Sequence, residues 1–213
     1  MRTLQDCRFY GILDTGYCAP DRMGSMLERM IAGGVHLVQL RAKDLAPAAV
    51  ADLARVLHPV SSAHGVPFIL NDYPELVRET GVEGAHVGVD DMSVAEARAR
   101  AGIACWIGKS SHSVSQAVEG ARQGADYLGF GPLFATPTKP DYVPVGVAEI
   151  RDVQRRVDIP VFCIGGIKRE NLRDVRGAGA ERAVIVSGLL LAADVAGYAA
   201  ECAAILSAEP ISG

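Results

Sequence analysis

The sequence predicts an α/β protein built as a single (β/α)8 TIM barrel. Short apolar runs rich in β-branched residues alternate with longer amphipathic runs along the whole chain, which gives eight strand–helix units. Several short runs are apolar at consecutive positions, as expected of parallel strands buried on both faces. An open doubly wound sheet would share this pattern, but the count of eight units favours the closed barrel. We expect residues 1–213 to form one domain.

The elements follow from the period of the apolar residues and from the turn signals between them. The strand candidates, in chain order, are Arg8–Leu13, His36–Arg41, Pro67–Leu70, Gly84–Val87, Ala104–Ile107, Tyr127–Phe130, Val161–Ile164 and Arg182–Val186. The helix candidates are Met23–Ala32, Pro47–Ala63, Val94–Ala101, Val114–Gln123, Val147–Arg156, Arg169–Arg176 and Val195–Leu206, with a shorter one at Pro74–Glu79. Ser93 and Ser113 directly precede two of these helices and are typical N-caps. Gly65 and Gly102 follow two others, where a left-handed residue ends a helix.

Composition excludes several classes of protein. The net charge is −4 and the chain has no basic run, so nothing indicates binding to nucleic acid or to a charged membrane surface. Residues 1–6 lack a signal-peptide pattern and no apolar run has membrane-spanning length, which favours a cytoplasmic protein. The five cysteines are far apart and have no CxxC spacing, so a disulfide framework or a zinc site is not expected.

In a barrel of this kind the catalytic side chains lie at the carboxyl ends of the strands. Polar residues and glycines gather at that end of almost every predicted strand, whereas the opposite ends carry few groups with chemistry. The segments that follow strands two to eight are Gln39–Asp44, Asn71–Asp72, Gly88–Asp91, Gly108–His112, Gly131–Lys139, Gly165–Ile167 and Ser187–Gly188. The sequence therefore predicts the functional site at this end of the barrel.

Two aspartates follow adjacent strands in this set. Asp72 comes after the third strand and Asp91 after the fourth, so their carboxylates could converge on one hard cation. Mg²⁺ typically takes one or two protein carboxylates and completes its coordination with water and substrate phosphates. The same residues would equally serve as helix caps or surface ion pairs.

Gln39, Arg41 and Lys43 alternate at the end of the second strand, so all three side chains can point the same way. Arg41 can grip a phosphate through two hydrogen bonds, and Lys43 adds a mobile point charge. We favour this interpretation over an ordinary charged strand end, because two cations and an amide lie beside the two aspartates.

The last strand ends carry candidate phosphate sites. Thr136, Thr138 and Lys139 lie in a Gly- and Pro-bounded loop whose hydroxyls and ammonium suit an anion, although a plain surface turn would look the same. Gly165–Gly166 and Ser187–Gly188 follow strands seven and eight, where many barrels bind phosphate through backbone N–H groups.

Histidines offer an acid or a base at this end of the barrel, but we favour structural roles for them. His112 follows strand five and could act as an acid or base, yet it could equally hydrogen-bond a loop backbone. His86 lies within a strand and is more simply a satisfied core group.

These segments, in this order, resemble the thiamine-phosphate synthase family, and the resemblance runs from Phe9 to Leu206. The matching stretches are Phe9–Asp14, Gly33–Val35, Val38–Asp44, Ile69–Asp72, Gly84–Gly88, Asp90–Met92, Ile107–His112, Gly124–Tyr127, Gly131–Pro132, Thr138–Pro140 and Ile164–Ile167. A glycine pair alone matches many barrels, whereas the ordered set matches few.

The resemblance implies a barrel that joins hydroxymethylpyrimidine diphosphate to a thiazole phosphate with Mg²⁺ and releases diphosphate. It implies that Gln39, Arg41, Lys43 and Asn71 hold the pyrimidine diphosphate, that Asp72 and Asp91 bind Mg²⁺, and that Tyr10 borders the pyrimidine. It further implies that Ser110 contacts the pyrimidine or the diphosphate, and that Lys139 reaches the diphosphate. Thr136, Thr138, Gly166 and Ser187 would contact the thiazole phosphate. Arg41, Ser110 and Lys139 are the catalytic candidates, the partners are these small substrates, and a homo-oligomer stays open.

Two departures from the family pattern stand out. Val89 occupies a place where Gln is common, and Lys109 one where a small apolar residue is usual. Ser187-Gly188-Leu189 also resembles the related thiazole tautomerases, in which a His at the place of His112 is the suspected acid/base. The Asp72/Asp91 pair and the cations near it favour the synthase, since a tautomerase has no diphosphate to bind. The third alternative is a non-catalytic phosphate-binding barrel. The charged site residues argue against it, because a desolvated charge costs free energy when no ligand compensates it.

Overall fold

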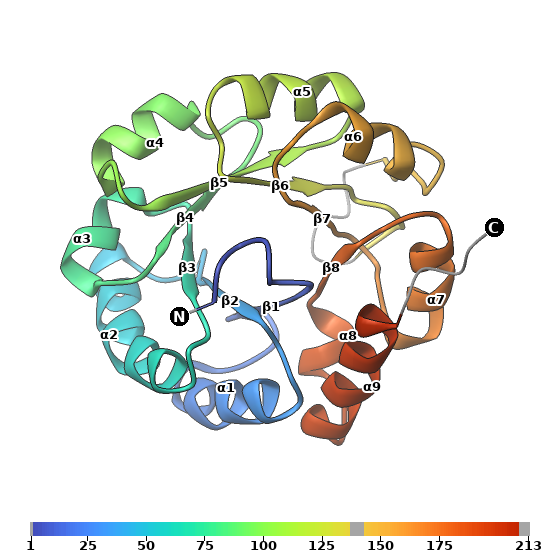
Figure 1. Cartoon of the computed structure of the whole chain (residues 1–213). Coiled ribbons are helices and arrows are strands. Elements are labelled where there is room, and N and C mark those ends of the chain that lie inside the picture. The colour runs from blue at the N-terminus through green and yellow to red at the C-terminus, as the bar shows by residue number, and fades with distance from the viewer. Residues whose placement is uncertain (1, 137–142, 209–213) are drawn as a thin grey trace.

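A computed structural model describes residues 2–136 and 143–208 of the chain. Within these residues, eight parallel strands close into a barrel in the order β1 to β8, and helices surround it (Figure 1). The barrel closes where β1 pairs with β8, with Phe9 opposite Ala183. The fold class predicted from the sequence is confirmed.

The strands are short and parallel, and the helices pack outside them. The strands are β1 Phe9–Asp14, β2 Leu37–Arg41, β3 Phe68–Asn71, β4 Gly84–Val87, β5 Trp106–Ser111, β6 Tyr127–Phe130, β7 Val161–Cys163 and β8 Arg182–Ile185. The α-helices are α1 Met23–Ala32, α2 Pro47–Ala63, α3 Val77–Thr80, α4 Val94–Ala101, α5 Val114–Arg122, α6 Ile150–Arg156, α7 Arg169–Gly177, α8 Ser187–Leu190 and α9 Val195–Ser207. Two 3-10 turns, η1 Pro20–Arg22 and η2 Pro74–Leu76, precede α1 and α3.

Large side chains fill the inside of the barrel. Tyr10, Tyr127 and Phe162 pack edge to face there, with ring centroids 5.3–6.0 Å apart. The N-terminal segment lies across one mouth of the barrel (Figure 1), and its buried Leu4 and Cys7 pack onto this interior cluster. In the described part of the chain, this segment covers the mouth at the amino ends of the strands, and the cavity described below lies at their carboxyl ends.

The structure departs from the predicted elements most at β5, α6 and α8. β5 continues to Ser111, four residues beyond the predicted end at Ile107, because Lys109 and Ser110 pair with Leu128 and Gly129 of β6. Their polar side chains made this part of the strand look like a loop. α8 was not predicted as a helix, and α6 begins at Ile150, not at Val147.

The predicted N-caps are confirmed. The Ser93 side chain accepts a hydrogen bond from the backbone N–H of Glu96 in a complete capping box, and the Ser113 side chain accepts one from Gln116. Among the described helices, none is both long and apolar enough to cross a membrane.

Candidate functional site

A cavity opens at the carboxyl ends of the strands, with about 950 Å³ of atom-free space including its mouth. Most of the residues predicted to bind substrate line it. They are Tyr10, Gln39, Arg41, Asn71, Ser110, Thr136, Gly166 and Ser187. Residues that are distant in the sequence therefore meet in one pocket, as the residues of a small-molecule site do.

A chain of hydrogen bonds crosses the floor of this cavity. The Gln39 amide donates to the Tyr10 hydroxyl over 2.7 Å, and the hydroxyls of Tyr10 and Tyr127 lie 3.1 Å apart. His86 continues the chain, with Nδ1 3.2 Å from the Tyr127 hydroxyl and Nε2 3.0 Å from the Ser110 Oγ. The chain links β2, β1, β6, β4 and β5, so it fixes both Gln39 and Ser110 where they face the cavity.

Both tyrosines in this chain stay protonated. Burial is the main cause that raises the pKa of Tyr10, and the pKa of Tyr127 is raised by burial and by its neighbour Tyr10. Each hydroxyl therefore keeps one proton to donate. The floor is a set of neutral hydrogen-bonding groups, which suits an uncharged ring with ring nitrogens and an amino group.

Arg41 reaches the cavity wall from the end of β2 and is held by a buried carboxylate. Its Nη1 donates to Asp14 Oδ2 over 2.7 Å, and the Asp14 side chain is only 2% exposed. Asp14 also accepts from the backbone N–H of Gly16 over 2.9 Å. The guanidinium is thus fixed in place by one of its N–H groups, and within residues 2–136 and 143–208 its other donors are open to an anion.

Asn71 carries a buried donor that has no partner in the described part of the chain. Its side-chain Nδ2 is buried and makes no hydrogen bond there, although the residue lines the cavity. An unsatisfied buried donor costs free energy, and a ligand atom that accepts its hydrogen bond would remove that cost. This is a direct structural indication of a polar ligand beside β3.

The two aspartates and Lys43 lie outside the residues that line this cavity, and Asp91 lines a neighbouring hollow with Lys109 and Ser110. Lys43 Nζ is 3.0 Å from Asp72 Oδ2, and Lys43 lies outside the cavity lining that Gln39 and Arg41 share. The pKa of Asp72 is raised, first by burial and also by the nearby Asp91 carboxylate, while Lys43 opposes the shift. Asp72 adopts the left-handed conformation at φ 67°, which is uncommon for non-glycine residues but more accessible to Asp than to most.

This arrangement fits a hydrated Mg²⁺. No group of three or more His, Cys, Asp or Glu in the described residues is placed to form a protein-only metal cage. Two adjacent carboxylates of like charge, one of them partly buried, are the donor set that Mg²⁺ uses when substrate phosphates and water complete its shell.

The opposite side of the cavity is built from backbone. Gly165 and Gly166 take φ values of 96° and 64°, and a Cβ at Gly166 would lie 2.7 Å from Phe134 Cβ. Only glycine fits there, which leaves this backbone open to the cavity. The Asn171 side chain donates to the Gly166 carbonyl over 3.0 Å and accepts from the Lys168 backbone N–H over 2.8 Å.

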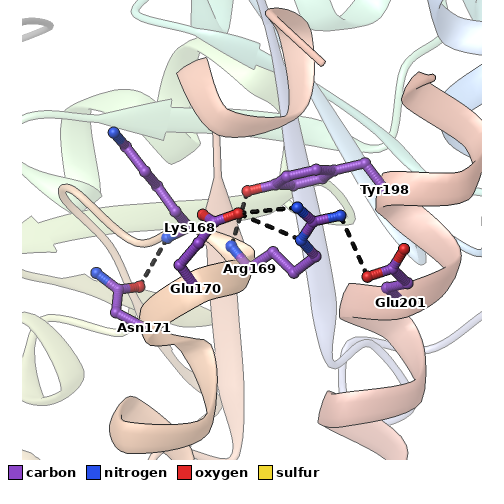
Figure 2. Close-up of polar contacts among 6 residues, drawn as sticks. All are labelled: Lys168, Arg169, Glu170, Asn171, Tyr198 and Glu201. Carbon is purple, nitrogen blue, oxygen red and sulfur yellow. Dashed lines mark hydrogen bonds and ion pairs between the residues drawn. The ribbon is translucent and has the colours of Figure 1, made fainter. Parts of the chain in front are cut away.

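A polar cluster braces this glycine loop from behind (Figure 2). The Tyr198 hydroxyl of α9 accepts from the Arg169 backbone N–H over 2.7 Å, and the guanidinium of Arg169 stacks 5.0 Å above the ring. Arg169 also pairs with Glu170 and Glu201 (Figure 2) at 3.1 and 3.2 Å. The cluster fixes the start of α7 against α9, so the glycine loop has a rigid support.

The sequence of the chain also matches known proteins. The sequence model of the family described as thiamine monophosphate synthase matches residues 9–189. The chain belongs to this family.

Relatives of similar length carry the same family name. A thiamine-phosphate synthase from Shouchella clausii is 40% identical over 189 residues, which cover 88% of this chain and 90% of the relative. One from Chloroflexus aurantiacus is 38% identical over 203 residues, which cover 95% and 94%. Among solved structures, a thiamine phosphate pyrophosphorylase from Pyrococcus furiosus superposes with a TM-score of 0.85 at 26% identity and covers 94% of this chain and 95% of its own.

Two of the residues that the family resemblance implies, Thr138 and Lys139, lie outside the described residues. Their contacts with substrate stay predictions.

The structure adds cavity residues that the sequence analysis did not select. Asp14 and His86 line the cavity, where Asp14 anchors Arg41 and His86 holds Ser110. Asp14 lies within a matching stretch but gave no signal of its own, because the pairing with Arg41 depends on strand register. His86 of β4 is the register partner of Asn71 of β3, and this pairing becomes visible only in the structure of the barrel.

His112 also lines the cavity, and its backbone and side chain both hold the loop. Its N–H donates to Gln116 over 2.7 Å, and its Nδ1 makes a short hydrogen bond to the Gly131 carbonyl. Because a carbonyl can only accept, Nδ1 carries the proton. This bond fixes the orientation of the imidazole ring, and the structural role that the sequence favoured for His112 stays a prediction.

Proposed function

We propose that the protein is a thiamine-phosphate synthase, which condenses hydroxymethylpyrimidine diphosphate with a thiazole phosphate to give thiamine phosphate and diphosphate. The observation that carries the proposal is a set of three adjoining parts: a cavity with a polar floor, its glycine-backbone wall, and, beside it, the hollow that Asp91 lines and that shares Ser110 with the cavity. A neutral ring, a diphosphate with Mg²⁺ and a second phosphate match these three parts. Membership of the thiamine monophosphate synthase family supports the same activity.

The pyrimidine would lie on the floor between β2, β3 and β5. Gln39 and Ser110 face it from the hydrogen-bonded chain, and the free Asn71 donor offers a bond to a ring nitrogen. Tyr10 borders it through its buried hydroxyl. Because these groups are fixed before the substrate arrives, binding orients the reactive methylene without a large ordering cost.

The diphosphate would lie between the cavity and the hollow that Asp91 lines, where positive charge and carboxylates meet. Arg41 and Lys43 would hold its oxygens, and the family resemblance adds Lys139 from the loop after β6. Mg²⁺ held by Asp72 and Asp91 would neutralise charge on the diphosphate as it leaves. Arg41, with its guanidinium fixed by Asp14, stabilises the same charge without reorganising during the reaction.

The thiazole phosphate would lie against the backbone wall. Gly166 and Ser187 would donate backbone N–H groups to it, and Thr136 and Thr138 would add hydroxyls. This places the thiazole nitrogen toward the pyrimidine methylene.

The chemistry then balances with few protein groups. The bond between the methylene and the diphosphate oxygen breaks, the methylene carries positive charge, and the thiazole nitrogen forms the new carbon–nitrogen bond. The thiazole nitrogen carries no proton and bonds through its lone pair, so the ring takes up the positive charge, diphosphate leaves with the electron pair of the broken bond, and no protein base is required. Arg41, Lys139 and Ser110 act by holding charge and position, not by attacking the substrate.

Incubation of the protein with both substrates tests the proposal. Thiamine phosphate should form when Mg²⁺ is present, and formation should stop when Mg²⁺ is removed by chelation. Absence of thiamine phosphate with active substrates and Mg²⁺ would overturn the synthase assignment. We further propose that the enzyme acts in the cytoplasm on small molecules and that residues 1–213 form one domain, which limited proteolysis would test.

A further inference from the structure

We propose that Lys109 is a positioning residue, which holds the Gly88–Met92 loop and with it Asp91 in the conformation that binds the metal. The inference rests on the proposed function only in taking Asp91 as a metal ligand. It concerns a residue that faces away from the substrate cavity, and it assigns a role to a side chain that departs from the family pattern.

The ammonium of Lys109 is bound by the loop itself. Lys109 lies within β5, where its neighbour Ser110 lines the cavity. Its Nζ donates to the carbonyl oxygens of Gly88 over 2.6 Å, Met92 over 2.9 Å and Val89 over 3.3 Å. An ammonium has three donors, so this one side chain satisfies three carbonyls of one short loop.

The same loop is held from the other side by Asp91. The backbone N–H of Gly88 donates to Asp91 Oδ2 over 2.6 Å, while the carbonyl of Gly88 accepts from Lys109. A side chain at position 88 would collide with the Asp91 carboxylate, so the turn is closed tightly on itself. Lys109, Gly88 and Asp91 therefore form one connected unit, and moving the ammonium would move the carboxylate.

The metal site needs this support because it holds two negatively charged carboxylates, Asp72 and Asp91, near each other. The loop carries Asp91, the second of the two carboxylates proposed to hold the metal, and two like charges held near each other cost free energy until a cation binds. A loop held only by its own turn would relax and separate them. The positive charge of Lys109 behind the loop lowers that cost, and its three hydrogen bonds fix the geometry.

The two departures from the family pattern meet at this loop. Val89 lacks the side-chain amide that is common at its position, and its carbonyl accepts from Lys109. Val89 and Lys109, twenty positions apart in sequence, thus contact each other in space. A random surface lysine would not bind three carbonyls of the segment that carries the metal ligand.

The test measures metal affinity apart from catalysis. Mn²⁺ replaces Mg²⁺ as a probe, and its dissociation constant is measured by electron paramagnetic resonance with saturating inorganic diphosphate. Lys109→Met removes the donors and keeps the length of the side chain, and Lys109→Arg keeps charge and donors. Arg100→Met on α4 is the control, since Arg100 is an exposed cation outside the site.

We expect Lys109→Met to weaken Mn²⁺ binding about 10- to 100-fold, as loss of outer support does at other metal sites. Lys109→Arg should lie nearer to the wild type, and Arg100→Met should match it. Turnover of Lys109→Met should recover at high Mg²⁺, with KM for the thiazole phosphate unchanged. A Mn²⁺ affinity like that of the wild type in a folded Lys109→Met protein would overturn the proposal. Weaker diphosphate binding by this variant in metal-free buffer would also overturn it, because Lys109 would then contact the substrate directly.

The measurement separates this inference from the proposed function. If the wild type binds Mn²⁺ with diphosphate but makes no thiamine phosphate, the synthase assignment fails and the role of Lys109 stands on the affinity data. If the wild type makes thiamine phosphate and the affinity of Lys109→Met is unchanged, only the role of Lys109 fails.

Discussion

Arg41 and Asp14 form a buried ion pair across the first two strands, with 2.7 Å between Nη1 and Oδ2. The two residues are direct partners in the register of β1 and β2, so the pair forms as soon as these strands align. The Arg41 side chain is 19% exposed and the Asp14 side chain 2%. One guanidinium edge is therefore fixed by the protein and the rest faces the cavity.

Asp14→Asn should lower both turnover and stability. The amide cannot hold the guanidinium as the carboxylate does, so Arg41 loses its fixed orientation toward the diphosphate. We expect a loss of roughly 1–3 kcal/mol in the free energy of unfolding, measured by urea denaturation, since a buried charged group loses its partner. kcat/KM for the pyrimidine diphosphate should fall, with KM for the thiazole phosphate little changed.

Asp52→Asn is the matched control, because Asp52 pairs with Arg55 on an exposed face of α2. Its stability should stay within about 0.5 kcal/mol of the wild type. Equal effects of the two substitutions would contradict the role given to Asp14.

Asp72→Asn and Asp91→Asn should each reduce turnover sharply while the fold stays intact. Each removes one of the two carboxylates that the metal requires, and each relieves the like-charge contact that helps to raise the pKa of Asp72. Circular dichroism should therefore resemble the wild type. Turnover equal to that of the wild type at limiting Mg²⁺ in both variants would remove the metal assignment.

Most of the fold could be predicted from the sequence, because it depends on local patterns. Helices α1, α2 and α4 begin and end at the predicted residues, since apolar periodicity and the Ser93 cap are local signals. β5 was predicted too short, because Lys109 and Ser110 are polar and their strand pairing is a tertiary effect.

The site was predictable where a residue type suggests its own chemistry. Arg41 and Asp72 were found from charge at strand ends. Asp14 and His86 were not, because their importance lies in the partners that the closed barrel gives them. The sequence marked Lys109 only as a departure from the family pattern. Its contacts with the Gly88–Met92 loop became known from the structure.

Tyr127→Phe should interrupt the hydrogen-bonded chain beneath the pyrimidine. Without the Tyr127 hydroxyl, Tyr10 and His86 each lose a partner, and His86 then holds Ser110 less firmly. We expect a loss of about 1 kcal/mol in the free energy of unfolding and a higher KM for the pyrimidine diphosphate alone. Kinetics with each substrate varied in turn would check this. Tyr73→Phe is the control, because Tyr73 takes no part in this series of hydrogen bonds. If Tyr73→Phe changed KM for the pyrimidine diphosphate as much as Tyr127→Phe, the effect would not be specific to Tyr127.

The protein should lose stability above about pH 9 through its buried thiols. Burial raises the pKa of Cys163 from the ordinary 9.0 to about 12. A thiol whose folded pKa is raised contributes fully below pH 9, and the contribution is lost as the pH rises from 9 toward 12. For this thiol the free energy of unfolding should fall by up to about 1.4 kcal/mol per pH unit in that range.

Denaturation at pH 8, 9, 10 and 10.5 would measure this slope. Cys163→Ala should have a shallower slope than the wild type, whatever its stability at pH 8. Iodoacetamide at pH 8.5 should label the partly exposed Cys105 well before Cys163 in the native protein. An unchanged slope in the variant would mean that Cys163 does not set the alkaline limit.

His112→Ala and Arg41→Ala distinguish the synthase from the related tautomerase activity. In the synthase, the bond-forming step needs a leaving diphosphate, which Arg41 holds, while His112 shapes the loop through the Gly131 carbonyl and Gln116. Arg41→Ala should then lose most activity and His112→Ala should retain most of it. In a tautomerase, proton transfer on the thiazole is the chemistry, so His112→Ala would abolish turnover, Arg41→Ala would matter little and Mg²⁺ removal would have no effect. Assays of both variants on both reactions give opposite orders of damage. We expect the synthase order, because the ion pair with Asp14 fixes Arg41 at the cavity wall, where it can hold the leaving diphosphate.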